Sequence, residues 1–570
     1  MKKVFFAVLA AGMVAAGCEK ENIFNQEDKT SVAPEADPVY DAAEDPEDQI
    51  SATSFERTIT ITFSDGGAAV EGDENKIVSV DGNAVTSNNT TTEKVKYILR
   101  GSTSNGFFKL YSDKKQAIVL DGVSITNLGG AAINNQSHKR CYVVVSGTNF
   151  LADGATYNTP AAEDEKAAFF SEGQLLFSGD GTLEVSATGK SGIASDDYIH
   201  IMGTPTLNVT SSAGHGIRGK DALTVDGGDI LVKVSANMKK GMTSDSLVVF
   251  NGGKTVINVT GGTAFDDEDQ EYKASAGVKA DGNVVFAGGE LTITNSGQGG
   301  KGISGDGNGY FQGGKVHVTV TGTNYGSSSS SGGGRPRATD TTDTSTNAKG
   351  IKMDGDIYIS GGDLYVTAAN HEAVEAKGLL YITGGTVYAQ SKDDAINSAG
   401  DMVIKGGHVC AYSTGNDGLD ANGNLYMEGG VVYAIGSGNP ELAMDANTEE
   451  GKKLYLSGGV LFAIGGLENG SSLTQSCYSA GSWSRNTWYS LTADGVTYCF
   501  KTPSAGGTAL VVSAASKPSV TSGVTPSGGT EEFNGMAVFG GSASGGSAVS
   551  LSNYTSGGGQ GGPGGPGGRW

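Results

Sequence analysis

The chain has 570 residues, of which 91 are glycine and 12 are proline, and its formal net charge is −23. The glycine content is too high for a helical protein, and the lack of a strict Gly-X-Y period excludes collagen. The negative charge argues against a nucleic-acid partner, because phosphate contacts require clustered Lys and Arg. The six histidines show no paired zinc spacing, so a zinc enzyme is not expected.

The amino terminus has the pattern of an export signal. Met1-Lys2-Lys3 precedes an apolar run that ends at Ala16 and is too short to span a bilayer permanently, which predicts a signal peptide over residues 1–17. The next residue, Cys18, is predicted to carry the lipid, although an ordinary signal peptide with a chance cysteine is the alternative. Residues 18–50 are rich in Asp, Glu and Pro and predict an unfolded acidic tether.

Glu19-Lys20-Glu21 resembles the acidic export signal of lipoproteins that certain Gram-negative gut bacteria display on their surface. This resemblance implies an outer membrane lipoprotein that is exposed at the cell surface. We expect the lipid anchor to be its only membrane contact, and we expect the protein to be a monomer.

An internal repeat dominates the chain. Gly-Gly doublets recur with a base period of 22 to 25 residues, and a short apolar strand stands on each side of them, as in NLYMEGGVVYAIG. A third short strand follows Gly or Ala in each period, as in GIKMDG. Three strands per period predict an all-β fold, a right-handed parallel β-helix over residues 101–465, with about 12–15 coils. Successive coils then bring equivalent residues to about 4.8 Å from one another.

The regions outside the period have other expected structures. Residues 51–100 predict an amino-terminal β cap, residues 466–540 an irregular carboxy-terminal β cap, and residues 541–570 a disordered Gly-rich tail. An exported chain permits a disulfide between Cys477 and Cys499. Cys141 and Cys410 lie in apolar strands and are expected to be buried thiols.

Acidic residues recur at one place in the carboxy-terminal coils. Alignment of HEAVEA, DDAINS, NDGLDA and ELAMDA predicts an acidic column, Glu375, Asn397, Asp420 and Asp445, and a corner column, Glu372, Asp394 and Asp417. Carboxylates at this spacing need a cation, protonation, or outward splay into water. Oxygen ligands favour Ca²⁺, and the alternative is a set of solvated turns. The predicted metal ligands are Glu372, Glu375, Asp393, Asp394, Asn397, Asn416, Asp417, Asp420 and Asp445.

Aromatic residues recur in the same coils. Three residues before each doublet lies a first tyrosine column, formed by Tyr358, Tyr381, Val403, Tyr426 and Tyr455. Three residues after it lies a second aromatic column, formed by Tyr365, Tyr388, Cys410, Tyr433 and Phe462. Strand alternation points these side chains outward, so exposed rings are predicted to bind pyranose rings. There are two alternatives: the aromatic residues are present only because they favour β-strands, or a loop or the terminal cap covers the rings.

The amino-terminal coils, such as AIVLDGVSITNLGGAAINNQSHKR and AAFFSEGQLLFSGDGTLEV, resemble a known family. These are exported bacterial β-helix proteins described as carbohydrate-binding domain-containing, whose fold is similar to that of pectate lyases. The resemblance covers roughly residues 55–465. It implies calcium sites and binding of cellulose-like or acidic glycans, without established catalysis.

Three functions remain open from the sequence. The first is a calcium-stabilised lipoprotein that binds polysaccharide without catalysis. The second is a calcium-dependent polysaccharide lyase, for which Lys377 and Lys392 are candidate bases near the acidic column; a hydrolase with two carboxylates also remains open. The third is an adhesin or rigid spacer.

Overall fold

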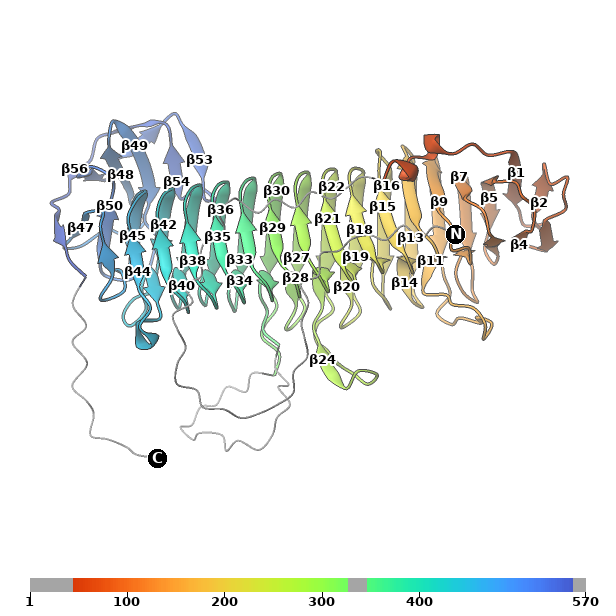
Figure 1. The fold of residues 1–570 in the computed structure, drawn as a ribbon, viewed down its shortest axis with the longest axis horizontal. Coiled ribbons are helices and arrows are strands. Elements are labelled where there is room, and N and C mark those ends of the chain that lie inside the picture. The colour runs from red at the N-terminus through yellow and green to blue at the C-terminus, as the bar shows by residue number, and fades with distance from the viewer. Residues whose placement is uncertain (1–44, 327–345, 557–570) are drawn as a thin grey trace. The chain divides into compact units, whose positions relative to one another are not determined.

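The computed structural model describes residues 45–326 and 346–556. It is a parallel β-helix of about 14 turns, and Figure 1 shows its coils stacked side by side. Residues 1–17, Cys18, the tether up to residue 44, and residues 557–570 of the tail lie outside the described residues. Within the described residues, no helix is both long and apolar enough to cross a membrane.

Each coil contributes one strand to each of three faces, which we call A, B and C. At the amino end, faces A and B are not yet separate and begin with three long strands: β1 (Arg57–Phe63), β5 (Val95–Thr103) and β7 (Gln116–Thr126). The first part of β7 pairs with β9 on face A, and its last part pairs with β10 on face B. From β9 onward the two faces are separate strands joined by a corner.

Face A consists of short parallel strands, namely β9 (Cys141–Ser146), β12 (Leu175–Gly179), β15 (Tyr198–Ile201), β18 (Ala222–Val225), β21 (Leu247–Phe250), β26 (Val284–Phe286), β29 (Gly309–Phe311), β32 (Ile357–Ile359), β35 (Leu380–Ile382), β38 (Met402–Ile404), β41 (Leu425–Met427), β44 (Leu454–Leu456) and β46 (Ser472–Leu473). Face B consists of β10 (Thr148–Ala152), β13 (Thr182–Ala187), β16 (Thr206–Ser211), β19 (Asp229–Val234), β22 (Lys254–Val259), β27 (Glu290–Asn295), β30 (Lys315–Val320), β33 (Asp363–Ala368), β36 (Thr386–Ser391), β39 (His408–Ser413), β42 (Val431–Ile435) and β45 (Val460–Ile464).

Face C consists of β4 (Ala84–Asn89), β6 (Phe107–Ser112), β8 (Ile133–Asn135), β11 (Ala167–Ser171), β14 (Ser191–Ser195), β17 (Ile217–Gly219), β20 (Lys240–Ser244), β25 (Ala276–Ala280), β28 (Lys301–Gly305), β31 (Ile351–Met353), β34 (Val374–Ala376), β37 (Ile396–Ser398), β40 (Leu419–Ala421) and β43 (Met444–Ala446). Antiparallel strands β2 (Ala69–Glu71) and β3 (Val78–Asp81) cover the amino end. A hairpin of β23 (Ala264–Asp266) and β24 (Glu271–Lys273) projects from one edge of the β-helix (Figure 1).

The three faces enclose one apolar core, as the period-2 alternation predicts. On β33, for example, Leu364 and Val366 are buried between half-buried neighbours. The same residues of successive coils stack on one another, so the core is continuous along the β-helix. Alternate residues of each strand therefore form columns on its outer surface.

The glycine doublet of each period forms the corner between faces A and B. At Gly384 an added Cβ would lie 2.4 Å from the carbonyl oxygen of Ser360 in the preceding coil. The second residue, Gly385, has a φ of 80°, which is in the left-handed region that favours glycine. The first residue is therefore glycine because the stacked corners leave no room for a Cβ, and the second because its φ is positive.

A segment before β1 lies against the outer side of face A. It contains two 3₁₀ helices, η1 (Pro46–Asp48) and η2 (Ile50–Ala52). Asp48 is buried and accepts a hydrogen bond of 3.1 Å from Arg140 Nε, and it lies 3.0 Å from His200 Nδ1. Burial lowers the pKa of His200, but its hydrogen bonds to Asp226 and Asp48 raise it to about 9. The prediction of an unfolded tether is therefore wrong for residues 45–50, because cations on the β-helix hold these acids.

The carboxy-terminal region forms a cap with its own antiparallel sheet. The strands of this region are β47 (Cys477–Ala480), β48 (Trp488–Ala493), β49 (Val496–Lys501), β50 (Leu510–Ser513), β51 (Ser519–Ser522), β52 (Thr525–Ser527), β53 (Thr530–Glu532), β54 (Ala537–Phe539), β55 (Ser542–Ser544), β56 (Ser547–Ala548) and β57 (Ser552–Tyr554), and the helix η3 (Thr448–Glu450) precedes them. The separate sheet consists of β48, β49, β51, β53, β54 and β56, whereas β47, β50 and β57 extend the sheet of the β-helix. Strand β50 pairs with β45 and so attaches the cap to the last coil. Residues 541–556 carry three of these strands, so the prediction of disorder is wrong there.

The possible disulfide between Cys477 and Cys499 does not form, and both thiols are free and buried. Cys477 lies on β47, which pairs with β50 and β57, and packs against the core of the β-helix. Cys499 lies on β49 in a different sheet, between β48 and β54. The two strands belong to different layers, which sequence separation alone does not reveal. The predicted burial of Cys141 and Cys410 is confirmed.

Candidate functional site

The predicted acidic column lies on face C. Strand register places Glu375 opposite Asn397, Asn397 opposite Asp420, and Asp420 opposite Asp445. The corner column precedes these residues by three positions, where the chain turns from face B into face C. Most of these side chains are buried rather than solvated, with relative exposures of 2% for Glu375 and 7% for Glu372, Asp394, Asn397 and Asp417. Solvated turns therefore do not describe this part of the β-helix.

A lysine balances the first two carboxylates. Lys349, itself buried, lies with its Nζ 2.5 Å from Glu375 Oε2 and 3.1 Å from Glu372 Oε2. Lys377 forms a second ion pair with Glu375. Burial raises the pKa of Glu372, but the hydrogen bond with His371 and the charge of Lys349 outweigh it and lower the pKa to about 2. Glu372 and Glu375 thus have lysine partners, which the aspartates of these columns in the next coils lack among the described residues.

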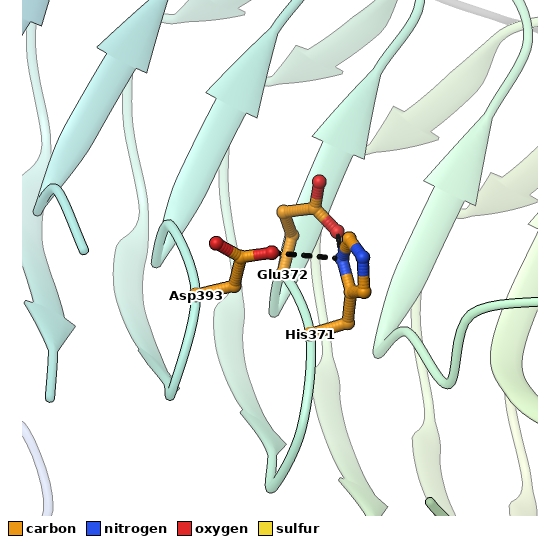
Figure 2. Close-up of side chains that lie close together, drawn as sticks. All are labelled: His371, Glu372 and Asp393. Atoms are coloured by element: carbon orange, nitrogen blue, oxygen red, sulfur yellow. Dashed lines mark hydrogen bonds and ion pairs between the residues drawn. The ribbon is translucent and has the colours of Figure 1, made fainter. Parts of the chain in front are cut away.

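A cluster of three side chains joins two successive coils at this corner. His371 and Glu372 precede β34, and Asp393 precedes β37 (Figure 2). His371 Nδ1 contacts Glu372 Oε2 and lies 3.1 Å from Asp393 Oδ2. Asn416 Nδ2 donates a hydrogen bond of 2.9 Å to the other oxygen of Asp393. One ligand atom from each of the three residues lies within 4.8 Å of the others, close enough to share one metal ion.

The remaining carboxyl groups of the two columns lack a cationic side chain as partner within the described part of the chain. Asp394, Asp417, Asp420 and Asp445 form no ion pair with any residue in the described ranges 45–326 and 346–556. Asn397 Nδ2 lies between two of them, 2.6 Å from Asp420 Oδ2 and 3.4 Å from Asp394 Oδ2.

Burial, followed by the charge of Asp445 and other carboxylates, raises the pKa of Asp417 to about 7. Burial and nearby carboxylates also raise the pKa values of Asp394 and Asp420, and burial together with Glu468 raises that of Asp445. These four groups therefore strongly favour a proton or a bound cation. Their donor atoms are carboxylate oxygens, which suit Ca²⁺ better than a transition metal. Within the described ranges, however, no three of these carboxyl groups place ligand atoms within 4.8 Å of one another.

The first tyrosine column lies on the outer side of face A, in register as predicted. Tyr426 and Tyr455 stack, with centroids 4.9 Å apart and an interplanar angle of 9°, whereas Tyr358 and Tyr381 meet edge to face at 6.4 Å and 71°. A residue absent from the prediction, Tyr310, stacks on Tyr358 at 5.3 Å and 17°. Rings stacked in this way cover one another's faces and leave mainly their edges exposed, and the Tyr358 hydroxyl donates a hydrogen bond of 2.8 Å to Asp356 Oδ2. The column therefore does not form the flat surface of ring faces that the sequence suggests, and Tyr381 is only 3% exposed.

The second aromatic column lies on face B, and the cap covers most of it. Tyr388, Tyr433 and Phe462 are at most 2% exposed. Phe462 stacks on Phe500 of β49 at 4.8 Å, and the Tyr433 hydroxyl donates a hydrogen bond of 2.9 Å to the carbonyl of Lys501. The prediction that these rings are exposed for ligand binding is wrong, because they form the core between the β-helix and the cap. Only Tyr365, at the edge of this cluster, keeps a half-exposed ring.

A shallow groove of about 270 Å³ crosses four coils where face B ends. Thr319, Thr367, Gln390, Lys392 and Thr414 line it with hydroxyl, amide and ammonium groups. Lys392 is exposed and, among the described residues, takes part in no ion pair, whereas Lys377 is engaged by Glu375. No pattern in the sequence indicates this groove, because its lining residues do not recur as a motif.

The structure and this arrangement define a class, a parallel β-helix with buried carboxyl groups on one face and stacked aromatic residues on another. A family model described as "Carbohydrate-binding domain-containing protein" matches residues 81–235 and 199–395, which together make up more than half of the chain. The chain belongs to this family.

A relative with the same description, from Acetivibrio thermocellus, is 26% identical over 177 residues. The match covers 27% of this chain and 62% of the relative, so this chain spans less than two thirds of that relative's length. A solved structure described as the polysaccharide lyase-like protein from C. thermocellum, a gadolinium derivative, is 20% identical with a TM-score of 0.37. That similarity covers 46% of this chain and all of the other.

Proposed function

We propose that this protein is a cell-envelope lipoprotein that binds polysaccharide without catalysis, and that calcium stabilises its carboxy-terminal coils. The family match over residues 81–395 is the observation that carries the binding proposal. The export pattern before Cys18 supports a lipid anchor in the outer membrane with the β-helix at the cell surface. The protein acts as a monomer, and nucleic acid is not among its partners.

The calcium part of the proposal concerns Asp394, Asp417, Asp420 and Asp445. These residues would hold the ion through carboxylate oxygens after side-chain movements that bring them together. Asn397 directs its amide nitrogen at Asp420 and Asp394, so its side chain would have to turn to offer its oxygen. A bound Ca²⁺ would supply the positive charge that Lys349 supplies to the preceding coil. The protein's own contribution is to hold these oxygens on successive coils by strand register, with Asp394 and Asp417 buried and Asp420 and Asp445 partly exposed.

Face A supplies the surface for the glycan. The stacked pairs Tyr310–Tyr358 and Tyr426–Tyr455 offer ring edges along the direction in which the coils stack. A polysaccharide chain that follows this direction meets an equivalent position about every 4.8 Å. Tyrosine suits such a surface because one end of its side chain is apolar and the other forms hydrogen bonds.

Replacing both Tyr426 and Tyr455 by alanine is expected to weaken polysaccharide binding about 10-fold, equivalent to about 1.4 kcal/mol. Both rings are half-buried at the surface, so the fold is expected to remain. Affinity would be measured on a glycan array and then by calorimetry, with absorbance at ultraviolet wavelengths recorded to detect lyase products. Tyr272→Ala, in the projecting hairpin, is the control. Unchanged affinity in the double variant would remove face A from the proposal, and an ultraviolet product would replace binding by lyase activity.

A further inference from the structure

The cluster of His371, Glu372 and Asp393 differs in chemistry from the proposed calcium ligands. Ca²⁺ is bound by about six to eight oxygen ligands, whereas an imidazole nitrogen is a ligand for zinc, copper, iron and nickel. This cluster offers one nitrogen and two carboxylate oxygens (Figure 2). Asp394 follows Asp393 in the sequence but does not belong to this cluster. Its side chain is buried and lies near Asp420, with Asn397 between them.

The distances within the cluster suit a small ion. Ligand bonds of about 2.0–2.2 Å in a tetrahedral zinc site place the ligand atoms about 3.3–3.6 Å from one another. His371 Nδ1 and Asp393 Oδ2 are 3.1 Å apart, and Glu372 Oε2 contacts the same imidazole nitrogen. Small movements of these side chains would therefore complete a tetrahedral arrangement.

The neighbours of the cluster orient its ligand atoms. Asn416, on the following coil, binds one oxygen of Asp393 and leaves the other directed at His371. Lys349 lies closer to Glu375, at 2.5 Å, than to Glu372, at 3.1 Å, so it has a partner of its own when Glu372 turns to a metal. Such outer contacts are typical of metal sites, in which they fix the orientation of the ligands.

The cluster is also open to solvent. The side chains of His371 and Asp393 are 18% and 33% exposed, and that of Glu372 is 10% exposed. An ion can therefore enter from solvent, and a water molecule can occupy the fourth position. We infer that His371, Glu372 and Asp393 bind one divalent transition-metal ion of the zinc class, which links two successive coils at the corner between faces B and C.

The inference is tested with Co²⁺ as a spectroscopic probe and Zn²⁺ as a competitor, using the full chain without a histidine tag. We expect one Co²⁺ per chain with the visible absorption of tetrahedral coordination, displaced by Zn²⁺ and not by Ca²⁺. His371→Asn is expected to weaken binding by at least about 100-fold, because even changes outside the ligand set cost about 10–100-fold. His138→Asn is the matched control, since His138 is exposed beside Glu172 in a second acidic cluster.

Loss of the Co²⁺ spectrum in His371→Asn and its retention in His138→Asn would establish the site. An unchanged spectrum in His371→Asn, or no bound Co²⁺ in the unaltered protein, would overturn the inference. Asp420→Asn separates this site from the proposed calcium ligands, because it should leave the Co²⁺ spectrum intact. Polysaccharide affinity is measured independently, so failure of this site leaves the proposed function standing.

Discussion

Removal of divalent cations is expected to destabilise the coils around residues 393–446, and the loss should grow as the pH rises. In the cation-free protein, the pKa values of Asp394, Asp417, Asp420 and Asp445 are raised above those of the unfolded chain. The folded state then binds more protons than the unfolded state. The contribution of these four groups to stability is greatest below about pH 4 and falls as the pH rises through about 7, the pKa of Asp417.

Calcium should abolish this pH dependence. A concentration of about 100 times its Kd would add about 2.7 kcal/mol to the free energy of unfolding. Hydrogen exchange is the suitable measurement, because the coils of a repeat protein can open locally. Protection of residues 393–446 should fall on chelation at pH 7.5 and stay nearly constant at pH 4.5.

Asp420→Asn and Asp306→Asn form a matched pair for this experiment. Asp306 is half exposed at the surface of an earlier coil and forms an ion pair with Lys279. Asp420→Asn should stabilise the cation-free protein at pH 7.5 and reduce its response to calcium, whereas Asp306→Asn should leave that response unchanged. Equal exchange with calcium and with chelator at both pH values would contradict the calcium proposal.

Lys349→Met is expected to destabilise the protein by about 3–5 kcal/mol, since it leaves two buried carboxylates without their shared cation. Glu372 and Glu375 are both more than nine-tenths buried, and Lys349 itself is only 7% exposed. Thermal and denaturant unfolding would measure the loss. The triple variant that adds Glu372→Gln and Glu375→Gln should recover much of the stability, because an amide can be buried without a counterion.

Lys352→Met is the control for Lys349→Met. Lys352 lies on the adjacent strand β31 and pairs with Asp354, whose side chain remains 40% exposed. Exposed pairs contribute about 0–1 kcal/mol, so this change should have little effect. Equal effects of the two substitutions would show that Lys349 does not have the role assigned to it.

The register of both columns could be predicted from the sequence because one strong local signal repeats. Each period carries a glycine doublet and strands in which apolar residues alternate, and this pattern determines which side chains face inward. The alignment that places Glu375, Asn397, Asp420 and Asp445 in one column is the alignment found in the strands. Tyr310 carries the same signal, three residues before a doublet, and extends the first tyrosine column by one coil.

The partners of these columns could not be predicted in the same way. Lys349 ends a long insertion, and no periodic pattern indicates that its ammonium lies between Glu372 and Glu375. His371 became a candidate ligand only when the fold brought Asp393 of the next coil beside it. In both cases the contact joins residues that are more than twenty positions apart and belong to different turns.

The sequence by itself determined the fold class, the direction of each strand residue and the stacking of equivalent residues, because these follow from local periodicity. Only the tertiary structure decided which outward residues remain accessible. The cap covers Tyr388, Tyr433 and Phe462, and the segment before β1 lies on face A beside His200. Outward direction is a local property of the backbone, whereas exposure depends on which distant segments pack against that surface, and such packing leaves no period in the sequence.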